Sequence, residues 1–305
     1  MFLPLAEAAA ALAPRWPPAA GPGPVHQRRR CLPRSPMHLA IAAWDLHRVT
    51  GGRFLLGLGT QVRVHVEHRY GAVWGRPVAH LRDLVDAVHA VFASFQTGAP
   101  LAVHNEHYHL DYLPPLFNPG PLPWGPPPVW CGAFGPAMTR MVAGTADGLL
   151  VHPFHTERSL HELTLANVTA GLTAAGRDRA DLGIGVSTLV CAGRDERELA
   201  VAEQGCRWLL AFYGSTPAYR PVLELEGAGE LQPELHRLAR EGRWEDMAAS
   251  IDDDLLDRLC VRGAPAEVGA ELTRRYGPVA DRVGLTLPYD APDDLLTEVV
   301  AATPR

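Results

Sequence analysis

The chain has 305 residues and a formal net charge of −6, and because it contains no lysine, all 28 of its Lys+Arg side chains are arginine. The absence of lysine excludes Schiff-base catalysis through lysine and a Walker-type phosphate loop, and the charge argues against a nucleic-acid partner. No apolar run approaches the roughly 18 residues that a membrane-spanning helix needs, and five scattered cysteines fit a reducing compartment. We therefore expect a cytoplasmic protein, folded as one α/β barrel or as two domains.

Residues 1–33 differ in composition from the rest of the chain. They include an alanine-rich run, the proline-rich sequence PRWPPAAGPGP and the basic sequence QRRR. No helical or strand period continues beyond Ala13, so we expect a loose segment. The folded domain is predicted to span residues 34–305.

The first regular elements are predicted at residues 37–50 and 54–58. The former has apolar residues at helical spacing, and Gly51 follows it as a typical helix stop. The sequence FLLGL at 54–58 predicts a short buried strand. Gly57 and Gly59 weaken a strand, so they indicate the close approach of another backbone or of a ligand.

Helix-like and strand-like segments then alternate along the chain, which is typical of a parallel sheet with crossover helices. Further helices are predicted at 78–95, 138–146, 160–175, 195–212, 265–276 and 292–302, and further strands at 129–133, 148–152, 183–191 and 279–287. Residues 101–112 predict a small hairpin, and residues 217–262 predict irregular structure or short helices. Five parallel-type strands suit an open doubly wound sheet or most of an eight-stranded barrel. Because no third glycine follows Gly59 to complete GxGxxG, the dinucleotide-binding sheet is the weaker interpretation.

Several motifs in order resemble those of the bacterial luciferase-like monooxygenase superfamily, and more narrowly its coenzyme F420-dependent oxidoreductase branch. They are GGRFLLGLG at 51–59, the charged loop with Glu67, HYHLDYL, PPPVWCGAFGPAMTRMVAGTADGLLVHPF and VADRVGLTLPY. The resemblance runs from about residue 33 to residue 305. It implies an α/β fold of the (β/α)8 TIM-barrel type, with the cofactor at the carboxyl ends of the strands.

The resemblance also implies which residues hold the cofactor. Residues 51–59 become the fourth strand, with Gly57 and Gly59 toward the cofactor ring. In related proteins the turn after the fifth strand holds the cofactor phosphate, and this role is carried over to Gly132, Ala133 and Gly135. Backbone amides at a helix start suit a phosphate without a cation, although without the resemblance the turn reads equally well as an ordinary helix start with a proline.

Two residues are candidates for acid–base catalysis. Glu67, with His65 and Tyr70 beside it, lies in the loop that covers the ring in relatives, but a solvated loop carboxylate is the alternative. His152 ends the predicted sixth strand, where polar residues of barrels are often functional. Its alternative is a hydrogen-bonded structural histidine.

The stretch with His104, Glu106, His107 and His109 contains good metal-ligand types, but a zinc site needs side chains that converge on one point. On a hairpin we expect His107 and His109 to share a face, and no distant partner cluster is evident, so we predict no metal site. Ser187 lacks the GxSxG elbow, which leaves hydrolase chemistry poorly supported.

The mechanism implied by the resemblance is hydride transfer between coenzyme F420 and a small organic substrate, with protein groups that position the substrate and move a proton. If FMN binds instead, the same barrel would run a monooxygenase reaction with oxygen. The sequence alone leaves both cofactors open.

The N-terminal part departs from the family pattern. Relatives have three barrel strands before the helix at 37–50, and strands of about 5 and helices of about 10 residues with loops would need roughly 45 residues. We therefore expect a barrel that is incomplete at its N-terminus, with no third strand beside strand 54–58. One hypothesis is that residues 1 to about 31 arise from a frameshift or a wrong start, which the upstream DNA read in all frames would test. The alternative function is then a catalytically impaired remnant, whose open strand edges favour pairing, for example in a homodimer.

Overall fold

The computed structural model describes residues 25–30 and 34–303, and for residues 25–30 it describes the backbone alone. The chain divides into two compact units. The first contains Met1–Ala133, Ala137–Leu149 and Gly171–Leu182, and the second contains Phe134–Pro136, Leu150–Ala170 and Gly183–Arg305.

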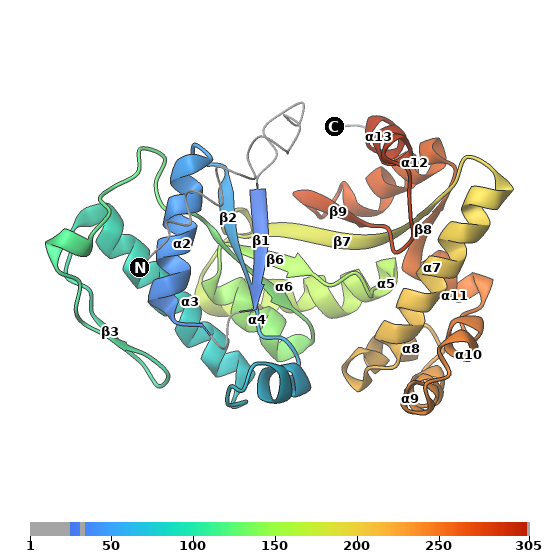
Figure 1. Ribbon diagram of the computed structural model, residues 1–305, viewed down its shortest axis with the longest axis horizontal. Helices are drawn as coiled ribbons and strands as arrows, with labels where there is room; N and C mark the ends of the chain where they lie inside the picture. Colours follow the sequence, from blue (N-terminus) through green and yellow to red (C-terminus); the bar gives the residue numbers. More distant parts are fainter. Residues whose placement is uncertain (1–24, 31–33, 304–305) are drawn as a thin grey trace. The chain divides into compact units, whose positions relative to one another are not determined.

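The first unit is built on parallel strands (Figure 1). Strand β2 (Phe54–Gly59) lies between β1 (Val25–Arg30) and β5 (Val129–Ala133). All residues of β2 except the last are buried. A continuous apolar run is what a parallel strand covered on both faces requires, so the predicted strand is confirmed.

Strand β1 changes the expectation for the N-terminal segment. The sequence predicted a loose stretch up to residue 33 and no strand beside residues 54–58. Instead, β1 pairs with β2 along its whole length, with Val25 opposite Phe54 and Arg30 opposite Gly59. Residues 1–24 and 31–33, on which the rest of that expectation depends, lie outside the described residues.

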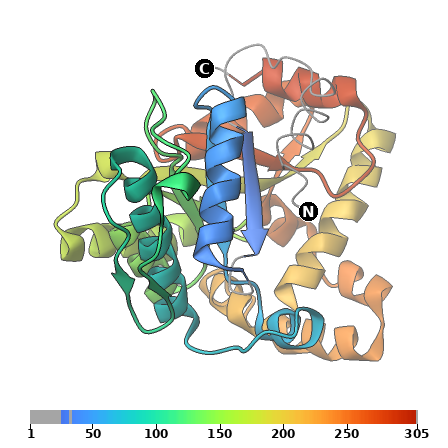
Figure 2. The same cartoon turned by 60° about the vertical axis from the view of Figure 1, so that its left-hand side comes forward.

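Three helices of the first unit were predicted and are confirmed within a few residues: α2 (Pro36–Val49), α3 (Pro77–Thr97) and α4 (Pro136–Thr145). Each begins with a proline in its first turn, where the missing amide hydrogen costs nothing. Helix α2 contacts both α3 and β2 (Figure 2). The buried Trp44 of α2 packs against Phe92 and Phe95 of α3.

Shorter elements complete this part of the chain. They are the π-helix η2 (His65–Arg69), the hairpin strands β3 (Val103–His104) and β4 (His109–Leu110), and the 3-10 turns η3 (Pro115–Phe117) and η5 (Arg179–Asp181). The chain passes between the units within β6 (Gly148–Val151) and within α6 (Ala166–Ala175).

The second unit contains the long strand β7 (Gly183–Ala192), and two other strands of this unit pair with it in parallel. Strand β8 (Cys260–Gly263) follows it along Leu189–Ala192, and β9 (Arg282–Thr286) follows it along Gly185–Leu189. Strand β8 was missed, since it lies in the stretch predicted to be irregular. The described residues thus contain seven strands besides the small hairpin, two more than predicted, and the predicted α/β class with a parallel sheet is confirmed.

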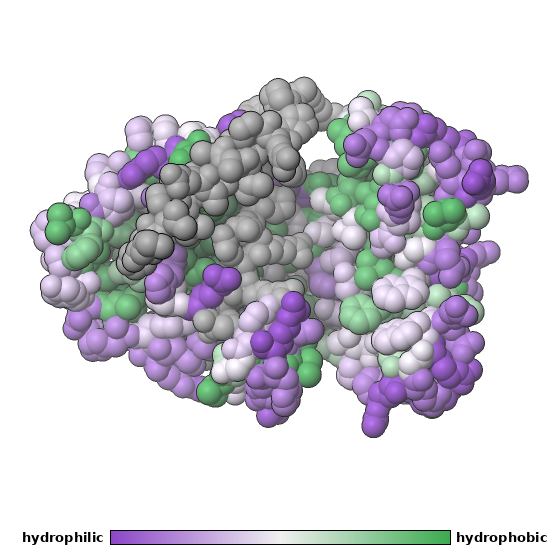
Figure 3. All heavy atoms as spheres, viewed as in Figure 1, coloured by the Kyte–Doolittle hydropathy of each residue, from purple (hydrophilic) through white to green (hydrophobic). Residues whose placement is uncertain are grey.

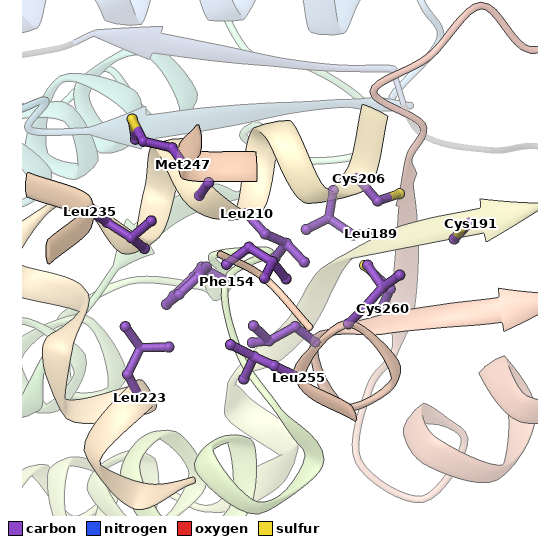
Figure 4. Close-up of a cluster of buried hydrophobic side chains, with 14 of the residues drawn as sticks. Phe154, Leu189, Cys191, Cys206, Leu210, Leu223, Leu235, Met247, Leu255 and Cys260 are labelled. Carbon is purple, nitrogen blue, oxygen red and sulfur yellow. The ribbon is translucent and has the colours of Figure 1, made fainter. Parts of the chain in front are cut away.

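The second unit contains many helices, several of which contribute residues to an apolar core. In chain order they are α5 (Glu157–Ser159), η4 (Leu160–Leu165), α7 (Glu196–Gly214), η6 (Pro217–Tyr219), α8 (Arg220–Leu225), α9 (Leu231–Glu241), α10 (Trp244–Ala249), α11 (Asp253–Leu259), α12 (Pro265–Tyr276) and α13 (Asp293–Ala301). Figure 4 shows Phe154 surrounded by leucines of this core, among them Leu210, Leu223 and Leu255. Because Phe154 is buried here, it anchors the loop that follows β6.

Hydrophobic residues on the face in Figure 3 occur as small patches among hydrophilic ones. The longest helices among the described residues contain charged or polar side chains at intervals. None of the described helices has the length and apolar character needed to cross a membrane.

Candidate active site

The carboxyl ends of β2 and β5 lie side by side in the first unit. Their register places Leu58 opposite Cys131, so Gly59 and Gly132 are the next residues on the two neighbouring strands. Among the described residues, a Cβ added at Gly59 would meet no atom within 4 Å, and one at Gly132 would meet only the Leu58 carbonyl oxygen at 3.7 Å. The described residues therefore leave this strand end open. Gly57 lies deeper, opposite Trp130, and is buried.

The turn after β5 leads directly into α4. Gly135 has a φ of +80°, a left-handed conformation that favours glycine, and a Cβ there would meet nothing within 4 Å. Ala133 is buried, so its contribution to this turn is its backbone. The turn combines small residues with the first amides of a helix, which have no partner within the helix, and this arrangement suits a phosphate group.

The start of β5 is held by the carboxylate of Asp147. Asp147 accepts hydrogen bonds from the Val129 amide (2.7 Å) and from Nε2 of His89 (3.1 Å). Although burial raises the pKa of Asp147, these two hydrogen bonds bring it below its usual value. The ionised carboxylate thus connects the start of β5 to helix α3.

Glu67 lies in η2, a helical turn where the sequence predicted a loop. Its carboxylate accepts a hydrogen bond from Nε of Arg63 at 2.9 Å, within an exposed ion pair one helical turn apart. His65 lies in the same turn, and Tyr70 is exposed beside it. These contacts are those of a surface turn, and the catalytic role of Glu67 stays a prediction.

His152 follows β6 and is held through both ring nitrogens. Its Nδ1 accepts the Phe154 amide hydrogen at 3.1 Å, so the ring proton is on Nε2. This N–H donates a hydrogen bond to the hydroxyl oxygen of Tyr219, which lies 3.1 Å from Nε2. His152 thus has a fixed tautomer and a fixed orientation, and its partner is a group that could itself donate a proton.

The sequence did not identify Tyr219 as a site residue, because it lies in the stretch predicted to be irregular. Its ring packs edge-on against Phe134, with centroids 4.5 Å apart, and against Tyr213 at 6.2 Å. Phe134 directly precedes Gly135, so Tyr219 lies against the turn predicted to hold the cofactor phosphate. Burial raises the pKa of Tyr219 to about 12, so that its hydroxyl is protonated at neutral pH.

A buried polar chain supports the loop that carries His152. Nδ1 of His155 donates to the His152 carbonyl oxygen at 2.8 Å, and its Nε2 accepts from the Tyr276 hydroxyl at 3.3 Å. The Tyr276 oxygen in turn accepts from Thr188 at 2.9 Å. Burial lowers the pKa of His155 to about 4, so that this chain contains a neutral imidazole.

The structure therefore brings the predicted residues together in two groups. Gly59, Gly132 and Ala133 lie at one strand end of the first unit, with Gly57 deeper in the same strand. Gly135 and His152 belong to the second unit, where Phe134 and Tyr219 connect them. Glu67 is in the first unit, in contact with Arg63.

Comparison with known proteins places this arrangement in a family. A family model described as luciferase-like monooxygenase matches residues 30–282. The chain is 42% identical over 250 residues to an uncharacterized protein of Mycobacterium tuberculosis, covering 82% of this chain and 74% of that protein. It is 29% identical over 243 residues to a 5,10-methylenetetrahydromethanopterin reductase of Archaeoglobus fulgidus, covering 77% of this chain and 67% of the reductase.

Solved structures share the fold. The coenzyme F420-dependent tetrahydromethanopterin reductase of Methanopyrus kandleri matches with a TM-score of 0.70 at 17% identity, over 92% of this chain and 80% of that one. The oxygenating constituent of 3,6-diketocamphane monooxygenase from Pseudomonas putida, in complex with FMN, matches with a TM-score of 0.59 at 16% identity, over 94% and 78%. One neighbour thus depends on a deazaflavin and the other contains a flavin.

Proposed function

Because the chain belongs to the luciferase-like monooxygenase family, we propose that it is a coenzyme F420-dependent oxidoreductase acting on a small organic substrate. The observation that carries this proposal is the 29% identity to a methylenetetrahydromethanopterin reductase, since a reductase of tetrahydromethanopterin with the same fold depends on coenzyme F420. The FMN-containing neighbour is similar in fold alone, at 16% identity.

The described residues fit such a cofactor at the strand end and at the turn. Side chains larger than hydrogen at Gly59 and Gly135 would fill space in which the part of the chain that the structure describes places no other atom within 4 Å. We assign ring contact to Gly57 and Gly59, and phosphate binding to the backbone of Gly132, Ala133 and Gly135. Amide donors at a helix start need no lysine or arginine to hold a phosphate, which suits a chain without lysine.

When bound, coenzyme F420 supplies the hydride donor or acceptor. We assign to Tyr219 the proton that the substrate oxygen needs when a carbonyl compound is reduced. The N–H at Nε2 of His152 donates a hydrogen bond to the Tyr219 oxygen, so the hydroxyl hydrogen of Tyr219 is directed away from His152 and is available to a substrate oxygen. His152 is the positioning residue of this pair, and Phe134 limits the rotation of the tyrosine ring.

An FMN-dependent monooxygenase is the second candidate, and the FMN-containing neighbour favours it. A catalytically impaired remnant is the third. One titration with both cofactors distinguishes these candidates from the proposal, because the monooxygenase binds FMN and the remnant binds neither cofactor.

The test is a fluorescence titration of the purified full-length protein with oxidised coenzyme F420 and, in parallel, with FMN. We expect saturable quenching of the deazaflavin fluorescence and weaker or no binding of FMN. Tighter binding of FMN would replace the proposal by the monooxygenase. A folded protein that binds neither ring would support the remnant.

A further inference from the structure

The histidine-rich hairpin brings two imidazoles together in a way that the predicted alternation did not anticipate. The Asn105 amide donates to the Tyr108 carbonyl at 3.0 Å, which closes a two-residue turn of Glu106 and His107. His104 and His109 form the next cross-strand pair. In an antiparallel ladder this next pair is the one without backbone hydrogen bonds, where opposite side chains approach most closely.

The two rings face each other through the same nitrogen. Nδ1 of His104 lies 3.0 Å from Nδ1 of His109, and the ring planes are inclined by 68°. Two nitrogens bound to one tetrahedral zinc ion, each at about 2.0–2.1 Å, lie roughly 3.3 Å apart. A shift of a few tenths of an ångström would therefore give the pair the spacing of metal ligands, and both side chains are exposed enough for water to complete the coordination.

Asp111 orients the second ring. Nε2 of His109 donates to the Asp111 carboxylate at 3.1 Å, which leaves the lone pair of His109 on Nδ1. Metal-bound histidines usually donate their other ring hydrogen to a carboxylate in this way. The lone pair of His104 becomes available on Nδ1 when its proton is carried by Nε2, the ordinary alternative tautomer.

A second group of ligand-type residues, Asp83, Glu106 and His107, lies in the same region but is engaged with cations of the chain. Glu106 pairs with Arg76, and Asp83 accepts from both His107 (2.8 Å) and Arg82. Burial raises the pKa of Asp83, but the hydrogen bonds from His107 and Arg82 outweigh it and hold the carboxylate ionised. A metal ion there would have to displace these partners. Between His104 and His109 it would take the place only of the hydrogen that the two Nδ1 atoms share.

We propose that His104 and His109 bind a divalent transition-metal ion of the zinc class through their Nδ1 atoms, with Asp111 holding the His109 ring. Imidazole pairs suit zinc, copper and nickel rather than magnesium or calcium. The two strands contain only two residues each, and an isolated hairpin of that size is marginally stable. The bound ion cross-links these strands and stabilises the hairpin.

The test is a calorimetric titration of the full-length protein with zinc chloride, at neutral pH and in a non-coordinating buffer. We expect one binding event that His104→Asn and His109→Asn each abolish, and that Asp111→Asn weakens roughly tenfold or more. His161→Asn, which removes an exposed histidine of η4, is the matched control and should bind zinc as the unaltered protein does. The melting temperature without zinc verifies that each variant is folded.

His107→Asn distinguishes the two groups of ligands. Unchanged zinc binding in this variant supports the proposal, whereas its loss would assign the ion to Asp83, Glu106 and His107 and overturn the proposal. Undiminished binding by His104→Asn and His109→Asn would overturn it as well. In a second readout, zinc should slow amide hydrogen exchange across residues 103–110 in the unaltered protein but not in His104→Asn.

Discussion

The strand end at Gly59 and Gly132 and the cluster around His152 are two kinds of candidate site. The former consists of backbone and of space that side chains leave empty, and it follows from two neighbouring strands in register. The latter consists of side chains from separate segments: Phe134 after β5, His152 after β6, and Tyr219 in η6. A backbone site tolerates no added volume, whereas a side-chain site depends on single polar atoms.

Substitutions at the two kinds of site should therefore affect different steps. Added volume at the strand end should affect cofactor binding without affecting the chemical step. Removal of one oxygen from the cluster should do the reverse.

The largest effect is expected for Tyr219→Phe, which removes the hydroxyl and keeps the ring that packs on Phe134. Loss of a general acid typically costs 10²–10⁴-fold, so we expect the single-turnover rate of hydride transfer to fall by roughly 100-fold or more. Coenzyme binding should be unchanged. Tyr112→Phe is the control, because that side chain is 80% exposed. A rate equal to that of the unaltered protein would show that Tyr219 is not the proton donor.

A second prediction concerns the stability of the second unit, through His155. Its pKa lies near 4 in the folded protein against 6.5 for an unperturbed histidine, so the unfolded chain binds the extra proton as the pH falls below 6.5. The contribution of neutral His155 is therefore fully present above that pH and is lost progressively toward pH 4, by about 3 kcal/mol in all.

Urea unfolding at pH 7 and at pH 5 should show about 2 kcal/mol of this loss in the free energy of unfolding, because pH 5 lies 1.5 units below 6.5. Carboxylates also titrate in this range, so the comparison is with His155→Gln, in which the pH dependence should be smaller. Equal pH dependence in both proteins would show that His155 is not buried as a neutral group.

The same contrast explains what the sequence could predict. Strand 54–59 and the turn at Gly132–Gly135 were found because apolar runs, glycines and a following proline are local signals. Tyr219 carries no such signal: its importance arises from His152, which lies 67 residues earlier in the chain. Strand β8 was missed for a similar reason, because four residues that pair with β7 are too few to show a period.

The hairpin shows a further limit. Alternation along a strand predicted that His107 and His109 would share a face, but His107 lies in the two-residue turn, where alternation does not apply. Its ring contacts Asp83, and His109 faces His104 instead. The residue types were correctly noted from the sequence, while the register that pairs them was not.

A third prediction tests the strand end directly. Gly59→Val places a branched side chain in space where no described residue has an atom within 4 Å, and valine is favourable in a strand. We expect coenzyme F420 to bind at least about tenfold more weakly, a loss of about 1.4 kcal/mol, with no decrease in melting temperature. Gly75→Val is the matched control, because a Cβ there also meets nothing within 4 Å. Equal affinity for coenzyme F420 in both variants would show that the cofactor ring does not contact Gly59.

The smallest effect is expected for Glu67→Gln, which separates the predicted catalytic role from the observed contact. Glu67 accepts from an exposed Arg63 one helical turn earlier, and exposed pairs of this kind contribute little to stability. The melting temperature should therefore be unchanged within error, and the rate of hydride transfer should change less than about threefold, well below the loss typical of an acid or base. A 100-fold loss, together with an altered pH–rate profile, would restore Glu67 as the catalytic group. It would also show that η2, and not only the cluster around His152, takes part in the chemical step.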